Sequence, residues 1–290
     1  MRKTAIIGVA SGAGARDPGC ADGPESLQIA GVLADLQTPA TPLVWEEPIR
    51  GRGHPASGAV AAVADIATQV AERVQAVIRR NDFPLVIGGD HSIAIGTWSG
   101  VRASLPRDQR LGLLWIDAHL DSHTFATTPT RAIHGMPLAC LLGRGEAALT
   151  TIAGPGPKVL ADDICLIGAR SFEWKEMELL KTLGARIYFM PEIRERGVAT
   201  ILDEAIDHVT ANTASFGISF DLDAFDPSEE AATGTPVAGG LFRADVLAAM
   251  EKVRNDPRLG AMEIVEYNPH RDADHATARA IHDLCQVVTR

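Results

Sequence analysis

The sequence has 290 residues, of which 46% are hydrophobic, and it carries a formal net charge of −10 at pH 7. This acidity argues against nucleic acid or an anionic membrane surface as a partner, because both attract basic patches. The length and apolar content suffice for one large core, and no linker rich in serine and proline interrupts the chain. We therefore expect a single domain over residues 1–290.

Four widely spaced cysteines without a CxxC pair are typical of buried free thiols in a reducing compartment. The N-terminus passes from Met1-Arg2-Lys3 straight into a strand-like run, with neither a signal peptide nor a spanning segment. These features predict a cytoplasmic protein.

Short apolar runs alternate with longer amphipathic stretches from end to end, which predicts strands covered on both faces and helices between them. The predicted strands are 4–9, 42–45, 85–87, 111–116, 164–168, 186–190, 216–220 and 261–266. The predicted helices are 23–34, one capped by Ser57 and running to 80, one from about 93, 172–183, 198–210 and 273–288; a loop at 47–55 carries His54 at the surface, and 81–84 is a turn. About eight strands alternating with helices predict a three-layer α/β/α sandwich around a central, mostly parallel sheet.

Polar side chains appear at every second position directly after the apolar run 111–116. They are Asp117, His119 and Asp121. In an extended segment, positions i, i+2 and i+4 share one face, so one strand end supplies three ligands. Acids that follow a buried run must be paired or bind something, which favours a metal site over a solvated loop.

Two other predicted strands end in the same way. His91 follows the strand 85–87, and Asp221 and Asp223 follow the strand 216–220. Because a parallel sheet places its chemistry at the carboxyl ends of the strands, we expect these side chains to meet the first cluster at one edge of the sheet.

Four carboxylates and two imidazoles gather in this way, and two divalent ions balance the four negative charges, whereas one ion would leave the acids crowded. Oxygen-rich ligation with some nitrogen and no thiolate favours Mn²⁺ over Zn²⁺. Such a pair of ions lowers the pKa of a bound water to about 7, so hydrolysis is the natural chemistry. The predicted ligands of two Mn²⁺ per chain are His91, Asp117, His119, Asp121, Asp221 and Asp223.

Several motifs occur in the order and spacing of one known family. They are Gly-Gly-Asp-His-Ser (88–92), Asp-Ala-His-Leu-Asp (117–121), Ile-His-Gly-Met-Pro-Leu (133–138), Ser-Phe-Asp-Leu-Asp-Ala-Phe-Asp-Pro (219–227), Thr-Gly-Thr-Pro-Val-Ala-Gly-Gly-Leu (233–241) and Glu-Ile-Val-Glu-Tyr-Asn-Pro (263–269). Over nearly the whole chain the sequence thus resembles the ureohydrolases, which are arginase, agmatinase, guanidinobutyrase and formimidoylglutamase. The resemblance implies the arginase-like fold, a homo-oligomer (trimer or hexamer), and hydrolysis of a guanidino group to urea and an amine.

The resemblance also implies roles for individual residues. The first ion takes His91, Asp117, Asp121 and Asp221, and the second takes Asp117, His119, Asp221 and Asp223. Asp121 matches the residue that orients the nucleophile, and His134 matches the proton shuttle, a role that suits an imidazole with an ordinary pKa near 6.5. Glu266, assisted by Thr235, matches the carboxylate beside the guanidinium, where a planar cation wants a forked acceptor.

The loop after Asp121 departs from the arginase pattern. Arginases usually show Asn where His123 stands and Ser-Gly-Asn at 130–132, whereas Thr128 agrees with them. Arg131 either binds a substrate carboxylate, repels a diamine-like tail, or is a solvated loop arginine. The candidate substrate-binding residues are His123, Thr128, Thr130, Arg131, Glu173, Glu176 and Thr235.

The substrate expected from this resemblance is L-arginine or a close analogue. Glu173 and Glu176 look like the arginase residues for the substrate α-amino group, and Val237 is also arginase-like. Agmatine, guanidinobutyrate and formiminoglutamate stay open as alternatives. A zinc deacetylase shares this fold and an Asp-x-His pair but needs one metal.

Overall fold

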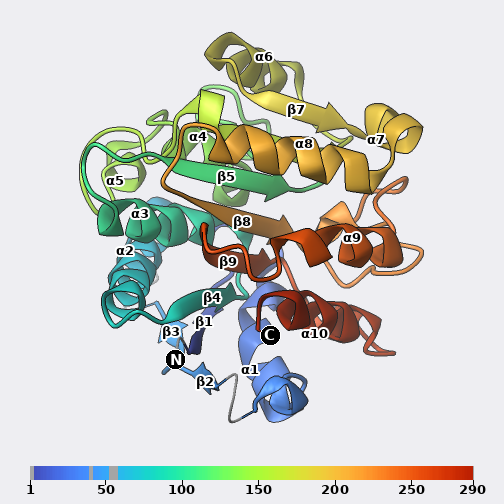
Figure 1. Ribbon diagram of the computed structural model, residues 1–290. Helices are drawn as coiled ribbons and strands as arrows, with labels where there is room; N and C mark the ends of the chain where they lie inside the picture. The colour runs from blue at the N-terminus through green and yellow to red at the C-terminus, as the bar shows by residue number, and fades with distance from the viewer. Residues whose placement is uncertain (1–2, 39–41, 52–57, 290) are drawn as a thin grey trace.

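The described residues form a nine-stranded parallel sheet that runs through the centre of the molecule (Figure 1). The structure is a computed structural model, and it describes residues 3–38, 42–51 and 58–289. The strands lie in the order β2-β1-β4-β9-β8-β5-β6-β7, and β3 pairs with β1. They are β1 (Thr4–Ala10), β2 (Leu43–Trp45), β3 (Ile49–Arg50), β4 (Phe83–Ile87), β5 (Leu111–Ile116), β6 (Ile164–Ala169), β7 (Arg186–Phe189), β8 (Ser215–Asp221) and β9 (Leu259–Val265).

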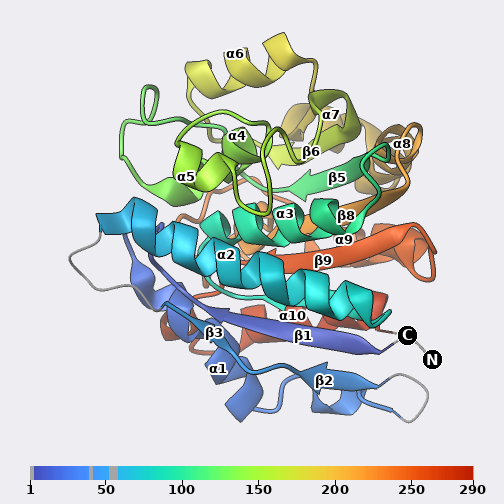
Figure 2. The same cartoon turned by 90° about the vertical axis from the view of Figure 1, so that its left-hand side faces the viewer.

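Helices cover both faces of this sheet. They are α1 (Gly23–Ile29), α2 (Gly58–Arg79), α3 (Ala94–Ser104), α4 (Pro137–Leu141), α5 (Ala147–Thr150), α6 (Trp174–Leu183), α7 (Met190–Arg196), α8 (Val198–Thr210), α9 (Arg243–Met250) and α10 (Ala276–Val288). Short 3-10 turns are η1 (Pro18–Asp22), η2 (Ala34–Leu36), η4 (His91–Ile93), η5 (Ile133–Gly135), η6 (Ala161–Asp163), η7 (Leu222–Ala224), η8 (Glu251–Val253) and η9 (Pro269–Arg271). Figure 2 shows α2 and α3 in front of the sheet, with α1 and α10 behind it.

Among the central strands, β4 and β5 are apolar at every position because each face packs against its own layer of helices. In β5, Leu113 and Trp115 belong to the core that includes residues of α2 and α3, whereas Leu114 and Ile116 belong to the core that includes residues of α8, α9 and α10. Alternate side chains of one strand therefore fill two cores. The predicted α/β/α sandwich is confirmed, with nine strands where about eight were expected.

Several local predictions were wrong. Strand β3 lies inside the predicted loop 47–55, α1 ends at Ile29 rather than near 34, and α4, α5, α7 and α9 were not predicted. Strand β4 begins at Phe83 and contains Pro84, which was expected in the turn before it. Pro84 is tolerated because only β1 pairs with it, while the pairing with β9 begins at Leu85. Ser57 and His54 lie outside the described residues.

Four neighbouring strands, β4, β9, β8 and β5, point their carboxyl ends at one edge of the sheet. Each is followed by polar residues of the motifs in the sequence. Pairing of these four strands therefore brings together segments that lie far apart along the chain. Among the described residues, none of the helices combines the length and the apolar character that crossing a bilayer requires.

Candidate active site

Polar residues from the four strand ends are buried together. His91 follows β4, Asp117 follows β5, Asp221 ends β8, and Glu266 follows β9. Each of these four residues is at most 3% exposed, so solvent cannot satisfy their polar groups. The common edge expected from the sequence therefore exists, and its polar side chains need partners inside the protein.

The segment that supplies Asp117, His119 and Asp121 is not extended, contrary to the sequence prediction. Strand β5 ends at Ile116, and Asp121 adopts a left-handed backbone with φ of +46°. The turn is fixed where Asp117 Oδ1 accepts a hydrogen bond from the His119 backbone N–H at 2.7 Å. These side chains therefore converge because the segment forms a tight turn, not because side chains alternate along a strand.

One half of the site surrounds His91. Its Nδ1 lies 3.0 Å from Asp121 Oδ2, 3.0 Å from Asp221 Oδ2 and 3.3 Å from Asp117 Oδ2. This nitrogen is buried and has no hydrogen-bond partner among the described residues. A buried ring nitrogen that faces three carboxylate oxygens without bonding to any of them fits a cation between them.

The other half surrounds His119. Its Nδ1 lies 3.1 Å from Asp223 Oδ2 and 3.5 Å from Asp117 Oδ1. Asp117 thus turns one carboxylate oxygen toward each histidine. Two groups of possible metal ligands share this residue, namely His91, Asp117 and Asp221, and Asp117, His119 and Asp223. The donor set of oxygens and imidazole nitrogens without thiolate fits hard or borderline divalent ions.

Without cations, the charges in this cluster are crowded. Burial, followed by repulsion from Asp117, raises the pKa of Asp121 to about 6. Burial, followed by repulsion from Asp223 and Asp117, raises the pKa of Asp221 well above its usual range. Burial opposes protonation of His91, yet the surrounding carboxyls of Asp117, Asp121 and Asp221 raise its pKa. Divalent cations would relieve this repulsion, because they neutralise the acids directly.

Half-buried His134 and buried Glu266 form a pair beside this cluster. His134 Nδ1 lies 3.1 Å from Glu266 Oε1, which also accepts a hydrogen bond from the His91 backbone N–H at 2.8 Å. Burial lowers the pKa of His134, but the contact with Glu266 outweighs it and raises the pKa to about 9. This pKa lies above the ordinary imidazole value near 6.5, so His134 favours its protonated form at neutral pH.

Gly14 positions the His134 segment, a role that the sequence did not reveal. Its N–H donates to Asp90 Oδ2 at 2.9 Å, and its carbonyl accepts hydrogen bonds from the backbone N–H groups of Ile133 and His134. A Cβ atom at Gly14 would lie 2.5 Å from Asp90 Oδ1, so only glycine fits. Gly14 therefore lets the backbone approach buried Asp90.

Acidic residues of a second loop line the mouth of the site. His123 Nε2 lies 2.8 Å from Glu173 Oε2 and 3.2 Å from Glu176 Oε2, and its Nδ1 lies 3.0 Å from Thr127 Oγ1. Glu173 and Glu176 also form the capping box at the N-terminus of α6. Burial is the largest cause that raises the pKa of Glu176 to about 8. These two glutamates therefore have a structural role as well as a place in the cavity.

The remaining candidates divide between the cavity and the outside. A cavity of about 210 Å³ is lined by candidate substrate-binding residues and by four of the candidate metal ligands, namely His123, Thr130, Glu173, Glu176, Thr235, His119, Asp121, Asp221 and Asp223. Thr235 donates to Asp223 Oδ2 at 3.1 Å. Thr128 and Arg131 are absent from the lining: Thr128 Oγ1 accepts two backbone hydrogen bonds of its own turn, and the Arg131 guanidinium lies over the Phe125 ring, 4.9 Å from its centre.

Residues that were not predicted from the sequence hold the predicted ones in place. Trp115 stacks on His91 with ring centres 4.2 Å apart, and its Nε1 donates to Asp117 Oδ2. Arg170 donates to backbone carbonyls that include those of Asp223 and Val237. Trp115 could have been found from its position two residues before the candidate ligand Asp117, whereas no local sequence pattern marks Arg170.

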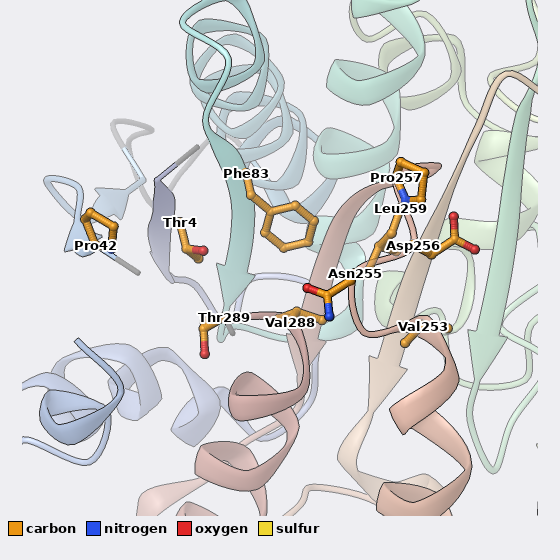
Figure 3. Close-up of a pocket in the computed structure, with 10 residues that line it drawn as sticks. All are labelled: Thr4, Pro42, Phe83, Val253, Asn255, Asp256, Pro257, Leu259, Val288 and Thr289. Atoms are coloured by element: carbon orange, nitrogen blue, oxygen red, sulfur yellow. The ribbon is translucent and has the colours of Figure 1, made fainter. Parts of the chain in front are cut away.

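A second cavity lies at the opposite edge of the sheet and lacks comparable chemistry (Figure 3). It has a volume of about 250 Å³ and is lined by the first residues of three strands, Thr4, Phe83 and Leu259. Asp256, its acidic group, is paired with Arg258 at 2.7 Å. Because parallel sheets place their chemistry at the carboxyl ends of the strands, this cavity is the weaker candidate.

Comparison with known proteins agrees with this geometry. The family model described as "Arginase family" matches residues 2–289. An arginase of Bacillus caldovelox is 37% identical over an alignment of 286 residues, and the match covers 96% of this chain and 95% of that protein. The native structure of Bacillus caldovelox arginase matches with a TM-score of 0.93 at 36% identity over 100% of this chain and 98% of that one. Formimidoylglutamase of Bacillus subtilis, at 21% identity, a TM-score of 0.81, and coverage of 99% and 86%, shares the fold.

Proposed function

Because this chain belongs to the arginase family, we propose that it is a binuclear manganese hydrolase that converts the guanidino group of L-arginine, or of a close analogue, to urea and an amine. The observation that carries the proposal is the orientation of Asp117, whose two carboxylate oxygens face two different histidines across a buried cluster of acids. A carboxylate shared in this way is suited to bridging a pair of divalent ions.

The ligand set that we propose is His91, Asp117, His119, Asp121, Asp221 and Asp223, shared between two Mn²⁺ as the family resemblance implies. Bound there, the two ions would supply an activated water at neutral pH for attack on the guanidinium carbon. Asp121 reaches His91 Nδ1 and also lines the cavity, so it can orient that water.

Proton transfer is the role that we propose for His134. Glu266 holds its Nδ1, which leaves Nε2 as the nitrogen that Glu266 does not engage. With its pKa raised to about 9 by Glu266 against the effect of burial, the imidazolium can donate a proton to the leaving amine at neutral pH. Glu266 and Thr235 are the proposed partners of the guanidinium.

The choice of L-arginine is supported by the acidic rim. Glu173 and Glu176 can accept hydrogen bonds from the α-ammonium group of the substrate, and both line the cavity. Arg131 gives no support to a substrate carboxylate, because it stacks on Phe125 outside the cavity. Agmatine therefore stays as the first alternative, with guanidinobutyrate and formiminoglutamate after it.

The test is urea release from L-arginine, agmatine and guanidinobutyrate by protein loaded with Mn²⁺, with formamide release from formiminoglutamate measured in parallel. We expect urea, with the highest kcat/KM for L-arginine. Formamide from formiminoglutamate as the preferred reaction would overturn the guanidino assignment. A zinc deacetylase would bind one ion per chain and release acetate.

We further propose a single-domain cytoplasmic enzyme that assembles as a homo-oligomer. The four cysteines are buried and free, which suits a reducing compartment. One continuous sheet joins the described parts of the chain, as expected of a single domain. Light scattering on the purified protein measures the oligomeric state, for which the family resemblance implies a trimer or hexamer.

A further inference from the structure

A chain of buried polar groups leads away from the metal-facing side of His91. His91 Nε2 lies 2.9 Å from Ser219 Oγ, and Ser219 donates to Glu263 Oε1 at 2.6 Å. The indole N–H of Trp98 donates to the same oxygen at 2.6 Å. These four residues are at most 1% exposed, so solvent satisfies none of them.

The hydrogen bonds in this chain fix where the protons lie. The Trp98 N–H can only donate, and the Ser219 hydroxyl donates to the same oxygen, so Glu263 Oε1 accepts both hydrogen bonds. Ser219 spends its single hydroxyl hydrogen on the same oxygen, so toward His91 it can only accept. In the neutral imidazole that a cation at Nδ1 requires, the ring hydrogen of His91 therefore lies on Nε2, and Nδ1 keeps its lone pair.

We propose that Glu263 is a positioning residue of the candidate metal centre. By orienting the Ser219 hydroxyl, it holds His91 in the tautomer whose Nδ1 lone pair faces the oxygens of Asp117, Asp121 and Asp221. Hydrogen bonds to the second nitrogen of a metal-binding histidine set the tautomer and the ring orientation in this way. The inference rests on the proposed function, because it assumes that a cation binds at Nδ1.

Two further observations support this role. Glu263 is 0% exposed, and a carboxylate is costly to bury at such a position unless its hydrogen bonds are needed there. The stacking of Trp115 on His91 fixes the plane of the ring. The hydrogen-bond relay from Glu263 through Ser219 therefore has to set only the tautomer of His91 and the rotation of its ring within that plane. Substitution of Glu263 should therefore weaken cation binding without moving the imidazole far.

The test is a double-mutant cycle on Mn²⁺ binding, measured by titration calorimetry of the metal-free full chain. The proteins are the wild type, Ser219→Ala, Glu263→Leu and the double variant. We expect each single substitution to lower the affinity for one of the two ions by roughly 10–100-fold. The double variant should bind within about twofold of Ser219→Ala, because Glu263 acts through the serine.

A merely structural role for Glu263 predicts a different outcome. The two fold-changes would then multiply in the double variant, and that result would overturn the proposal. If the wild type binds no Mn²⁺, the proposed function fails as well. If the wild type binds two ions but the effects of the two substitutions multiply in the double variant, only this inference fails.

Glu263→Gln keeps the test independent of folding defects. Its amide oxygen can accept from Ser219 and Trp98, while its nitrogen replaces Oε2, which takes neither of these bonds. We expect its Mn²⁺ affinity to lie much closer to the wild type than that of Glu263→Leu; equal weakening in both would contradict a relay through the acceptor oxygen. Ser99→Ala, which removes a buried hydroxyl without a hydrogen-bond partner among the described residues, is the matched control and should bind Mn²⁺ normally.

Discussion

The floor and the rim of the candidate site are built in different ways. The floor consists of the proposed metal ligands, which lie at or after the ends of β4, β5 and β8, and all of them except His119 are buried. The rim consists of the loops 122–135 and 170–176, where Glu173, Thr130 and Arg131 are exposed. Strand pairing brings the segments of the floor together and a tight turn after β5 completes it, whereas the rim depends on local turns and caps alone. Chemistry should therefore depend on the floor and substrate preference on the rim.

The largest effect is expected for a substitution in the floor. His119→Asn removes the imidazole that faces Asp223 and Asp117, so bound Mn²⁺ should fall from two ions to one per chain. Urea release should fall more than the 10–100-fold typical for loss of an outer partner of a metal ligand. Metal analysis and a urea assay measure both.

His275→Asn is the matched control for this substitution. His275 is exposed and has a left-handed φ of +58°, which asparagine also tolerates. It should retain two ions and full activity. Full turnover in His119→Asn would contradict the proposed ligand set.

The next largest effect is expected where floor and rim meet, at His134. His134→Asn removes the proposed proton donor but no proposed metal ligand, so kcat should fall by roughly 10²–10⁴-fold while Mn²⁺ binding stays the same. Steady-state kinetics together with metal content separate these effects. Loss of metal in this variant would show that His134 belongs to the floor instead.

A smaller effect, on KM, is expected for Glu176 in the rim. Burial, the largest cause, raises its pKa to about 8, so the carboxyl is mostly protonated at pH 7 and gains its charge as the pH rises through 8. Roughly 10% is ionised at pH 7 and about 75% at pH 8.5. KM for L-arginine should therefore fall about eightfold over this interval if only the ionised form binds the ammonium group.

Glu176→Gln isolates this charge, because glutamine still supports the capping box of α6. KM in this variant should be raised and should lose most of its change between pH 7 and 8.5. A KM that changes with pH to the same extent in both proteins would remove Glu176 from substrate recognition.

The smallest effect is expected at Arg131. Its guanidinium stacks on Phe125 and does not line the cavity, so Arg131→Ala should change KM for L-arginine by less than about threefold, given the weak contribution of an exposed cation–π contact. Kinetics on L-arginine and agmatine test this. A tenfold rise in KM for L-arginine alone would show that Arg131 turns inward to bind the substrate carboxylate.

The sequence predicted the floor better than the rim for a physical reason. A buried strand leaves an uninterrupted apolar run, and the polar residues after it stand out, so the positions of His91, Asp117 and Asp221 were readable. The parallel order of the strands then brought them together. The left-handed turn at Asp121 and the raised pKa of His134 depend on tertiary contacts, which leave no local pattern.

In the rim, the sequence named residues without fixing their directions. Arg131 was open between binding and solvation, and the structure places it against Phe125, a neighbour in the same loop. Glu173 and Glu176 were predicted for substrate binding alone, although their spacing also fits a capping box before α6. The hydrogen bonds from Trp98 and Ser219 to Glu263 were not predicted, because these residues lie in α3, β8 and β9, which come together only in the folded protein.

The central claim is that two divalent cations share Asp117 in the floor. Anomalous X-ray scattering from crystals of the full chain grown with Mn²⁺ tests it most directly. We expect two peaks per chain, one beside His91 and one beside His119, with a carboxylate oxygen of Asp117 next to each. A single peak, or none among these residues, would contradict the account.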